Sequence, residues 1–190
     1  GFLAMGPSLA TIPADNTDLV VHVSGINQGM HDDLRVANDY ASALSTAAML
    51  SDVGYEVVLS ASRQEAIDVA HYAYTRQTKR AFVHIFDGAY AACERSVLSP
   101  PSSKAPEPCT YTGPSAPATA LVMPHGAMSH RARALLLSLP PHLRGKVGIV
   151  SVRRLGSWDA AVLRRAVPTS VQTLRVVEEA FSSTDGALYA

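Results

Sequence analysis

Apolar and polar positions along the first half of the chain predict strands and helices in alternation. Leu19–Ser24 is apolar and β-branched, as buried parallel strands are. Ser42–Val53 is rich in alanine and leucine and is followed by Gly54, which predicts a helix with a glycine stop. Apolar residues at helical spacing in Thr78–Phe86 predict a second helix. The other elements that we expect here are strands at Glu56–Ser60, Ala66–Ala70 and Ala89–Ala92.

The second half repeats this order more loosely. Ser129–Leu139 carries apolar residues along one side and is stopped by two prolines, which predicts a helix. The remaining expected elements are strands at Ala120–Met123, Lys146–Val152 and Pro168–Val171, and helices at Ser157–Ala166 (with Trp158 inward) and Thr173–Phe181. Alternation of this kind predicts an α/β fold, with two units in series, each a parallel sheet covered by helices.

A proline-rich segment separates the two units. Ser99–Ala118 contains the run Ser-Pro-Pro-Ser-Ser-Lys-Ala-Pro-Glu-Pro, and proline at this density excludes helices and inner strands. We therefore expect a linker at 99–118 between a first unit at 19–98 and a second at 119–190. Residues 1–18 are expected to be an arm outside the fold.

The composition fits a globular, intracellular chain. Of its 190 residues, 47% are hydrophobic and 17% are charged, which is enough for one domain or two small ones. No apolar run reaches the roughly 18 residues that a membrane span requires. Cys93 and Cys109 are expected to be free thiols of a reducing compartment, with a single disulfide left open.

The net charge of zero conceals a basic second half. Between Glu107 and Glu178 the sole acidic residue is Asp159. The basic residues of the same stretch are Arg131, Arg133, Arg144, Lys146, Arg153, Arg154, Arg164, Arg165 and Arg175. Such a half favours an anionic partner, although a solvated helix face would have the same composition.

Two short motifs are candidate anion-binding half-sites. Ser24 and Gly25 end the first strand, where a hydroxyl and an accessible amide suit a phosphate. Arg76–Arg80 opens the predicted Thr78 helix, whose positive end, threonine hydroxyl and cations suit an anion too. A βαβ arrangement is expected to bring both to one crevice. Each motif alone is compatible with a turn cap or an exposed first turn, and the acidic residues Asp32, Asp33 and Asp39 oppose the site.

Two stretches resemble the BRCT family of DNA-damage and cell-cycle adaptors. The first is Val23-Ser24-Gly25, at the end of the first strand. The second is Thr78-Lys79-Arg80-Ala81-Phe82-Val83-His84-Ile85-Phe86-Asp87-Gly88-Ala89-Tyr90, which is similar to the family's Thr-x-Lys helix with its apolar core positions, glycine and aromatic residue. Val162–Val171, with Leu174 after it, resembles the end of a second repeat. The resemblance implies two BRCT repeats in tandem, each a small parallel sheet flanked by helices. In general character the chain also resembles the C-terminal BRCT module of kinetoplastid kinetochore proteins.

The resemblance further implies an adaptor that binds a phosphoserine or phosphothreonine segment of another protein, in the nucleus, without a cofactor and without enzymatic activity. Arg80 falls at the position of the family's lysine, with Lys79 as the alternative cation. Carried over residue by residue, the phosphate site is Ser24, Gly25, Thr78, Lys79 and Arg80, and the peptide groove includes Arg76 and Gln77.

Several other functions stay open. A BRCT pair can bind a partner through apolar surface without phosphate, and the basic half can bind DNA or chromatin-associated proteins. A caspase-like cysteine peptidase would pair His84 with Cys93, but His84 is expected in the middle of the Thr78 helix and Cys93 has no glycine-rich or strained setting. His125 and His130 are not the i, i+4 pair of a helical zinc site. A membrane or a small-molecule substrate is not expected.

Overall fold

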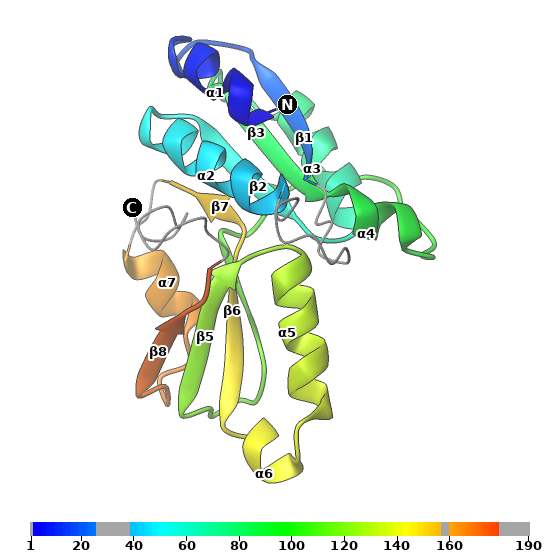
Figure 1. Ribbon diagram of the computed structural model, residues 1–190, viewed down its shortest axis with the longest axis vertical. Coiled ribbons are helices and arrows are strands. Elements are labelled where there is room, and N and C mark those ends of the chain that lie inside the picture. Colours follow the sequence, from blue (N-terminus) through cyan, green and yellow to red (C-terminus); the bar gives the residue numbers. More distant parts are fainter. Residues whose placement is uncertain (1, 26–38, 157–159, 179–190) are drawn as a thin grey trace.

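The computed structural model describes residues 2–25, 39–156 and 160–178, which form two four-stranded sheets flanked by helices (Figure 1). Most neighbouring strands are parallel. The α/β class expected from the alternating pattern is therefore confirmed. None of the helices within these ranges combines the length and apolar character needed to cross a bilayer.

The first sheet has the strand order β1-β3-β2-β7. Its three parallel strands are β1 (Val20–Gly25), β2 (Glu56–Ser60) and β3 (Phe82–Asp87). β3 is the central strand, and all of its residues except Phe86 are buried. Both faces of β3 are therefore covered by protein, which explains why its sequence is apolar without alternation.

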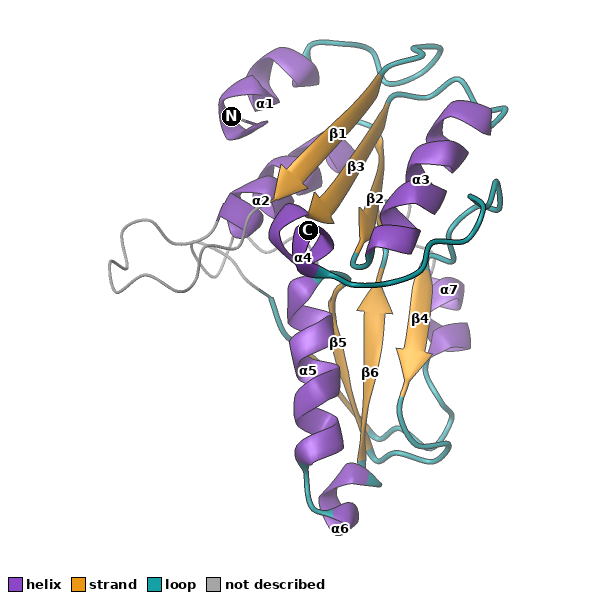
Figure 2. Ribbon diagram, turned by 90° about the vertical axis from the view of Figure 1, so that its right-hand side faces the viewer, coloured by secondary structure: helices purple, strands orange, loops and turns teal. Residues whose placement is uncertain are grey.

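Helices cover both faces of this sheet. They are α1 (Phe2–Ala10), α2 (Asp39–Asp52), α3 (Arg63–Thr75) and the short α4 (Gly88–Cys93). Leu44 of α2 shares a core with Val57 and Val83, whereas Val69 of α3 shares another with Val58 and Phe82. Successive strand residues point to opposite faces, so α2 and α3 lie on opposite sides of the sheet (Figure 2).

The second sheet has the order β4-β6-β5-β8. Its strands are β4 (Cys109–Thr112), β5 (Thr119–Pro124), β6 (Val147–Val152) and β8 (Thr173–Val176), and its helices are α5 (Ala127–Ser138), α6 (Pro141–Arg144) and α7 (Ala160–Ala166). β5 is parallel to both β6 and β8, whereas β4 is antiparallel to β6. The buried runs of β5 and β6 form the centre of this unit.

One strand of the second unit belongs to the first sheet. β7 (Arg154–Leu155) directly follows β6 and pairs antiparallel with β2, with Leu155 opposite Val57. The Leu59 amide also donates to the Arg153 carbonyl, at 2.7 Å. As Figure 2 shows, the carboxyl ends of β1 and β3 point toward the second unit, while that of β6 points toward the first. The carboxyl edges of the two sheets therefore meet.

The helix predicted at Thr78–Phe86 is wrong, because its apolar part is β3. Phe82, Ile85 and Phe86 fit the helical spacing i, i+3, i+4, but Val83 and His84 between them are buried too. A strand that is buried on both faces has no period that distinguishes it from a buried helix.

Other predicted elements are confirmed or corrected. Strands β1, β2, β5 and β6 and helices α2 and α5 lie within a few residues of the predicted bounds. Ala66–Ala70 is part of α3, not a strand, because Ser62 caps a helix that continues through this alanine-rich segment. Ala89–Ala92 is likewise helical, within α4.

The predicted arm and linker both pack against the fold. Leu9 of α1 is buried, and its carbonyl accepts a hydrogen bond from the Tyr55 hydroxyl at 2.7 Å. The linker runs along α3, where the Ser99 amide donates to Gln64 Oε1 at 2.6 Å, and it also contains β4. A prolyl segment can be ordered in this way when helix side chains accept its free amides.

The C-terminal expectations differ from the structure as well. Pro168–Val171 is a turn, closed by the Val171 amide and the Pro168 carbonyl, and the strand comes next, at β8, where a helix was expected. Of the helix expected at Ser157–Ala166, the structure describes α7 (Ala160–Ala166), and Trp158 lies outside the described residues. Phe181, Asp32 and Asp33 also lie outside them.

Candidate functional site

A carboxylate joins the two units where their carboxyl edges meet. Glu65 is the third residue of α3, and its amide donates to the hydroxyl of the capping residue Ser62. Its Oε2 accepts a hydrogen bond from the Ala61 amide at 2.9 Å and lies 2.7 Å from His125 Nε2. The turn from β2 into α3 is thereby bonded to the end of β5.

The loop between β5 and α5 places His125. The histidine follows β5 directly, and Gly126, with a φ of 146°, turns the chain into α5. Such a φ favours glycine. The Ser129 hydroxyl donates to the Gly126 carbonyl at 2.9 Å and accepts from the Gly126 amide at 3.1 Å. The imidazole is only 2% exposed, so the loop holds it against Glu65 and away from water.

The ionisation of this pair follows from its surroundings. Burial alone would raise the pKa of Glu65, but the hydrogen bond and charge of His125, the charge of Arg153 and the Ala61 amide lower that pKa to about 2. Burial lowers the pKa of His125, against the opposing effect of Glu65. At neutral pH we therefore assign an ionised Glu65 that accepts a hydrogen bond from a neutral His125.

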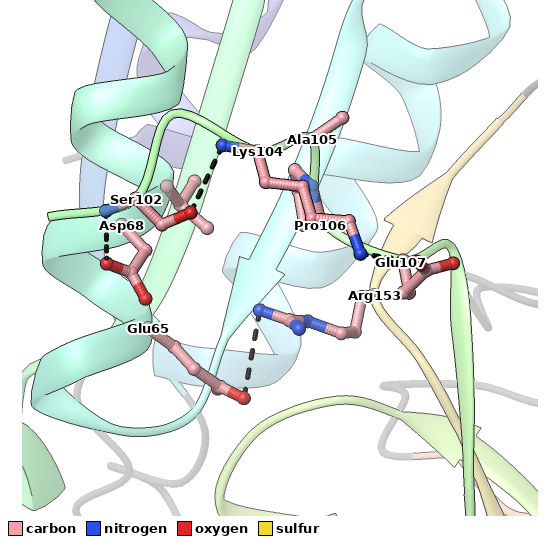
Figure 3. Close-up of a pocket in the computed structure, with 9 residues that line it drawn as sticks. Glu65, Asp68, Ser102, Lys104, Ala105, Pro106, Glu107 and Arg153 are labelled. Atoms are coloured by element: carbon pink, nitrogen blue, oxygen red, sulfur yellow. Dashed lines mark hydrogen bonds and ion pairs between the residues drawn. The ribbon is translucent and has the colours of Figure 1, made fainter.

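A pocket of about 180 Å³, lined by both charged and apolar residues, opens beside Glu65, between α3 and the linker segment 102–107 (Figure 3). Acidic and basic side chains both line it. The acidic ones are Glu65, Asp68 and Glu107, and the basic ones are Lys104 and Arg153. Arg153 follows β6, and its Nη2 lies 3.7 Å from Glu65 Oε1. The pocket therefore combines groups from both units.

A second buried ion cluster lies at the other end of β2. Glu56 Oε2 is 3.1 Å from Arg76 Nη1, and Glu56 Oε1 is 3.0 Å from Arg154 Nη2. The Tyr72 hydroxyl donates to the same carboxylate at 3.3 Å, and the Arg76 guanidinium lies 4.6 Å from the centre of the Phe82 ring. Because Arg154 belongs to β7, this cluster is a further tie between the units.

The structure does not bring the two predicted half-sites together. Ser24 is paired with Phe86 at the carboxyl end of β3, whereas Thr78–Arg80 precedes the amino end of that strand. At roughly 3.3 Å per residue, Ser24 and Arg80 are about 20 Å apart along the sheet. The expected single phosphate cradle is therefore not formed, because parallel strands place the end of β1 and the start of β3 at opposite edges.

The predicted cations have other neighbours. Arg76 is 4% exposed and is bonded to Glu56, to the Ala73 carbonyl and to the Arg80 carbonyl. Arg80 Nε lies 3.7 Å from Asp15 Oδ1. Arg76, Gln77, Thr78 and Lys79 do line one surface hollow of about 550 Å³, together with Tyr74 and Asp18. Four residues of the predicted cationic motif therefore line one hollow, and Ser24 and Gly25 are not among the residues that line it.

The residues weighed for other chemistry are also placed. His84 lies in β3 and not in a helix, with its Nε2 2.8 Å from Ser60 Oγ. Cys93 is exposed and Cys109 is half-buried, both are free thiols, and burial raises the pKa of Cys109 to about 11. Within the described ranges, no three or more His, Cys, Asp or Glu side chains are grouped as metal ligands.

Sequence reasoning missed Glu65, His125 and Arg153 as a joined set. The available signals were local ones: Ser62 and Glu65 have capping-box spacing, Arg153 directly follows a predicted strand, and His125 comes two residues after another. Because a strand was predicted at Ala66–Ala70, no helix was expected after Ser62, and the capping box was not recognised. The pairing across units could not be read from local spacing.

Comparison with known proteins finds one partial similarity. No family model matches the chain. Over 90 residues the chain is 33% identical to the pyruvate-flavodoxin oxidoreductase of Nostoc sp.. The similar segment covers 46% of this chain and 7% of the relative, so the chain corresponds to a small part of that enzyme's length.

Proposed function

We propose that this chain is a rigid α/β assembly module of a larger oxidoreductase. The partial similarity to a pyruvate-flavodoxin oxidoreductase supports the proposal that the chain is part of an oxidoreductase. The similar segment is only 7% of that relative. We therefore compare this chain with one structural part of a large enzyme and not with the complete enzyme. In this proposal the module positions neighbouring parts of the enzyme and does not transfer electrons itself.

The joint between the sheets is the observation that carries this proposal. Open α/β sheets commonly bind ligands at the carboxyl ends of their strands, and two-lobed binding proteins close about a hinge there. Here Glu65 is bonded to His125 across these edges, and β7 adds a strand of one unit to the sheet of the other. Such ties support a unit that stays rigid.

Exposed apolar side chains support contact with further protein. On the second unit, α5 exposes Leu135 and Leu137 by 66% and 69%, and Val176 on the edge strand β8 is 60% exposed. Exposed large apolar side chains are common where one domain packs on another. We therefore propose that α5 is one contact of the module with a neighbouring domain.

The test uses the purified chain and the Nostoc oxidoreductase with its similar segment deleted. We expect the two to sediment together, and we expect the chain alone to show no pyruvate-dependent reduction of flavodoxin. Changing Leu135 and Leu137 to serine should weaken the association. Reduction of flavodoxin by the isolated chain, or independent sedimentation of the two proteins, would contradict the proposal.

Phosphopeptide binding by a pair of BRCT repeats is a second candidate. Its support is the hollow that gathers Arg76, Gln77, Thr78 and Lys79. In this version Lys79 and Thr78 contact the phosphate and Tyr74 packs against the peptide. Titration with phosphorylated and unmodified peptides is the test, and equal binding of both, or an unchanged affinity after Lys79→Ala, would exclude this candidate.

A further inference from the structure

Arg153 has hydrogen-bonding capacity that the described part of the chain leaves unused. Its side chain is 13% exposed, and its Nε is buried without a hydrogen-bond partner among those residues. Its ion pair with Glu65 is long, at 3.7 Å. A guanidinium has five N–H donors, and a buried donor without an acceptor is unfavourable. This Nε has no accessible surface, so a group that enters the pocket and accepts hydrogen bonds would use the Nη donors of the same guanidinium.

Asp68 lies on the other wall of the same pocket and offers a hydrogen-bond acceptor where Arg153 offers donors. Its Oδ1 accepts two hydrogen bonds, from Gln64 Nε2 at 3.0 Å and from the Ser102 amide at 2.9 Å. Its Oδ2 has no hydrogen-bond partner among the residues that the structure describes. Figure 3 shows Asp68 on α3 and Arg153 across the pocket from it. An acceptor and a donor of opposite charge thus border one space.

The charges around this space discriminate between ligands. Three carboxylates and two cations line it, so a simple anion would meet the carboxylates, and a simple cation would meet the Arg153 fork. Lys104 and Glu107, 3.4 Å apart, are 78% and 63% exposed, so both can turn toward solvent when a ligand enters. A small molecule that carries both charges would satisfy both walls.

We propose that this pocket binds a small zwitterion, a free α-amino acid with a short side chain. The carboxylate is held by the Arg153 guanidinium, and the ammonium group donates to Asp68 Oδ2. A volume of about 180 Å³ with Val69, Ala105 and Pro106 in the wall suits glycine, alanine or serine better than larger residues. This binding does not depend on the assembly role proposed above.

The test is an NMR titration of the full chain with glycine, L-alanine and L-serine. Saturable shifts are expected at the Ser102 and Lys104 amides and at the Arg153 side-chain N–H, with a dissociation constant on the order of 1 mM. Propionate lacks the ammonium group of alanine and ethylamine lacks its carboxylate. Both should bind at least about tenfold more weakly.

Two substitutions test the two poles separately. Asp68→Asn keeps an oxygen for Ser102 and Gln64 but removes the charge, and Arg153→Lys keeps the charge but loses the fork. Each should weaken alanine binding at least about tenfold, while the exposed control variants Asp52→Asn and Arg131→Lys should not. Should Arg153→Lys fail to fold, Asp68→Asn and the ligand series still decide the question.

Three results would overturn the proposal. The first is propionate binding as tightly as alanine, which would indicate a simple anion site. The second is the absence of saturable shifts with all three amino acids up to roughly 50 mM, a concentration well above the expected dissociation constant. The third is a set of shifts located away from the pocket.

Discussion

His22 Nδ1 lies 3.0 Å from His84 Nδ1, across the neighbouring strands β1 and β3. Two bare nitrogens do not approach each other so closely, so one ring donates a proton to the other. His84 Nε2 is in turn 2.8 Å from Ser60 Oγ on β2. A row of hydrogen bonds therefore crosses all three parallel strands, on the face that α3 covers.

This row makes the fold sensitive to acid. His84 is 1% exposed, and burial, the charge of His22 and the charge of Arg153 lower its pKa from 6.5 to about 3. A histidine with a depressed pKa contributes stability that is present above pH 6.5 and is lost as the pH falls toward 3. At about 1.4 kcal/mol per pH unit, His84 should cost about 2 kcal/mol of unfolding free energy between pH 6.5 and pH 5. Urea unfolding at several pH values measures this slope.

Replacing the buried ring isolates its contribution to that slope. His84→Leu should lower stability at pH 7, because Ser60 and His22 lose a partner, yet it should flatten the decline in acid. His142→Gln, on the exposed α6, is the matched loss of a histidine and should keep the wild-type slope. An unchanged slope in His84→Leu would mean that His84 is not held neutral.

Glu65 should affect the free energy of unfolding in a lower pH range than His84 does. Its pKa is lowered from 4.5 to about 2, so its contribution is present above pH 4.5 and is lost as the pH falls toward 2. Glu65→Gln should therefore lower the free energy of unfolding at pH 7 by up to about 3 kcal/mol and remove part of the decline below pH 4.5. Glu107→Gln, a carboxylate that is 63% exposed, is the control and should change stability by less than about 0.5 kcal/mol. Equal effects of the two changes would show that the Glu65–His125 joint adds nothing.

Removing the carboxylate between Arg76 and Arg154 should be strongly destabilising. Glu56→Ala leaves the Arg76 side chain, 4% exposed, without a counter-ion, which costs about 3–5 kcal/mol in a buried pair. The exposed pair of Lys104 and Glu107 is the comparison, and Lys104→Ala should cost at most about 1 kcal/mol. Thermal and urea unfolding measure both. A loss below about 1 kcal/mol for Glu56→Ala would mean that water replaces the carboxylate.

A glycine in β6 allows an aromatic ring to lie on the second sheet. A Cβ at Gly148 would overlap the Tyr111 ring of β4, whereas one at Gly145 would meet nothing closer than the Pro141 carbonyl, at 3.7 Å. Gly148→Ala should therefore cost about 1–3 kcal/mol, and Gly145→Ala little. In a Tyr111→Ala background the cost of Gly148→Ala should fall, because the overlapping ring is gone. A cost that stays the same in both backgrounds would contradict this account.

Local pattern predicted the strands β1, β2, β5 and β6 and the helices α2 and α5 because each has a composition that matches one structure. It failed at β3, where residues on both faces are buried and the apolar run has no period to read. It failed also at α1 and the linker. Their order comes from contacts with distant residues, such as the bond from Tyr55 to Leu9.

By itself, then, the sequence determined the α/β class and most of the elements, because propensity and periodicity act over a few neighbouring residues. The tertiary structure alone decided which residues share a site. Glu65 and His125 are 60 residues apart and meet only because two sheets join at their carboxyl edges. Ser24 and Arg80, expected to meet, are separated by the parallel register of β1 and β3. Strand order and register are properties of the assembled sheet, and no local pattern contains them.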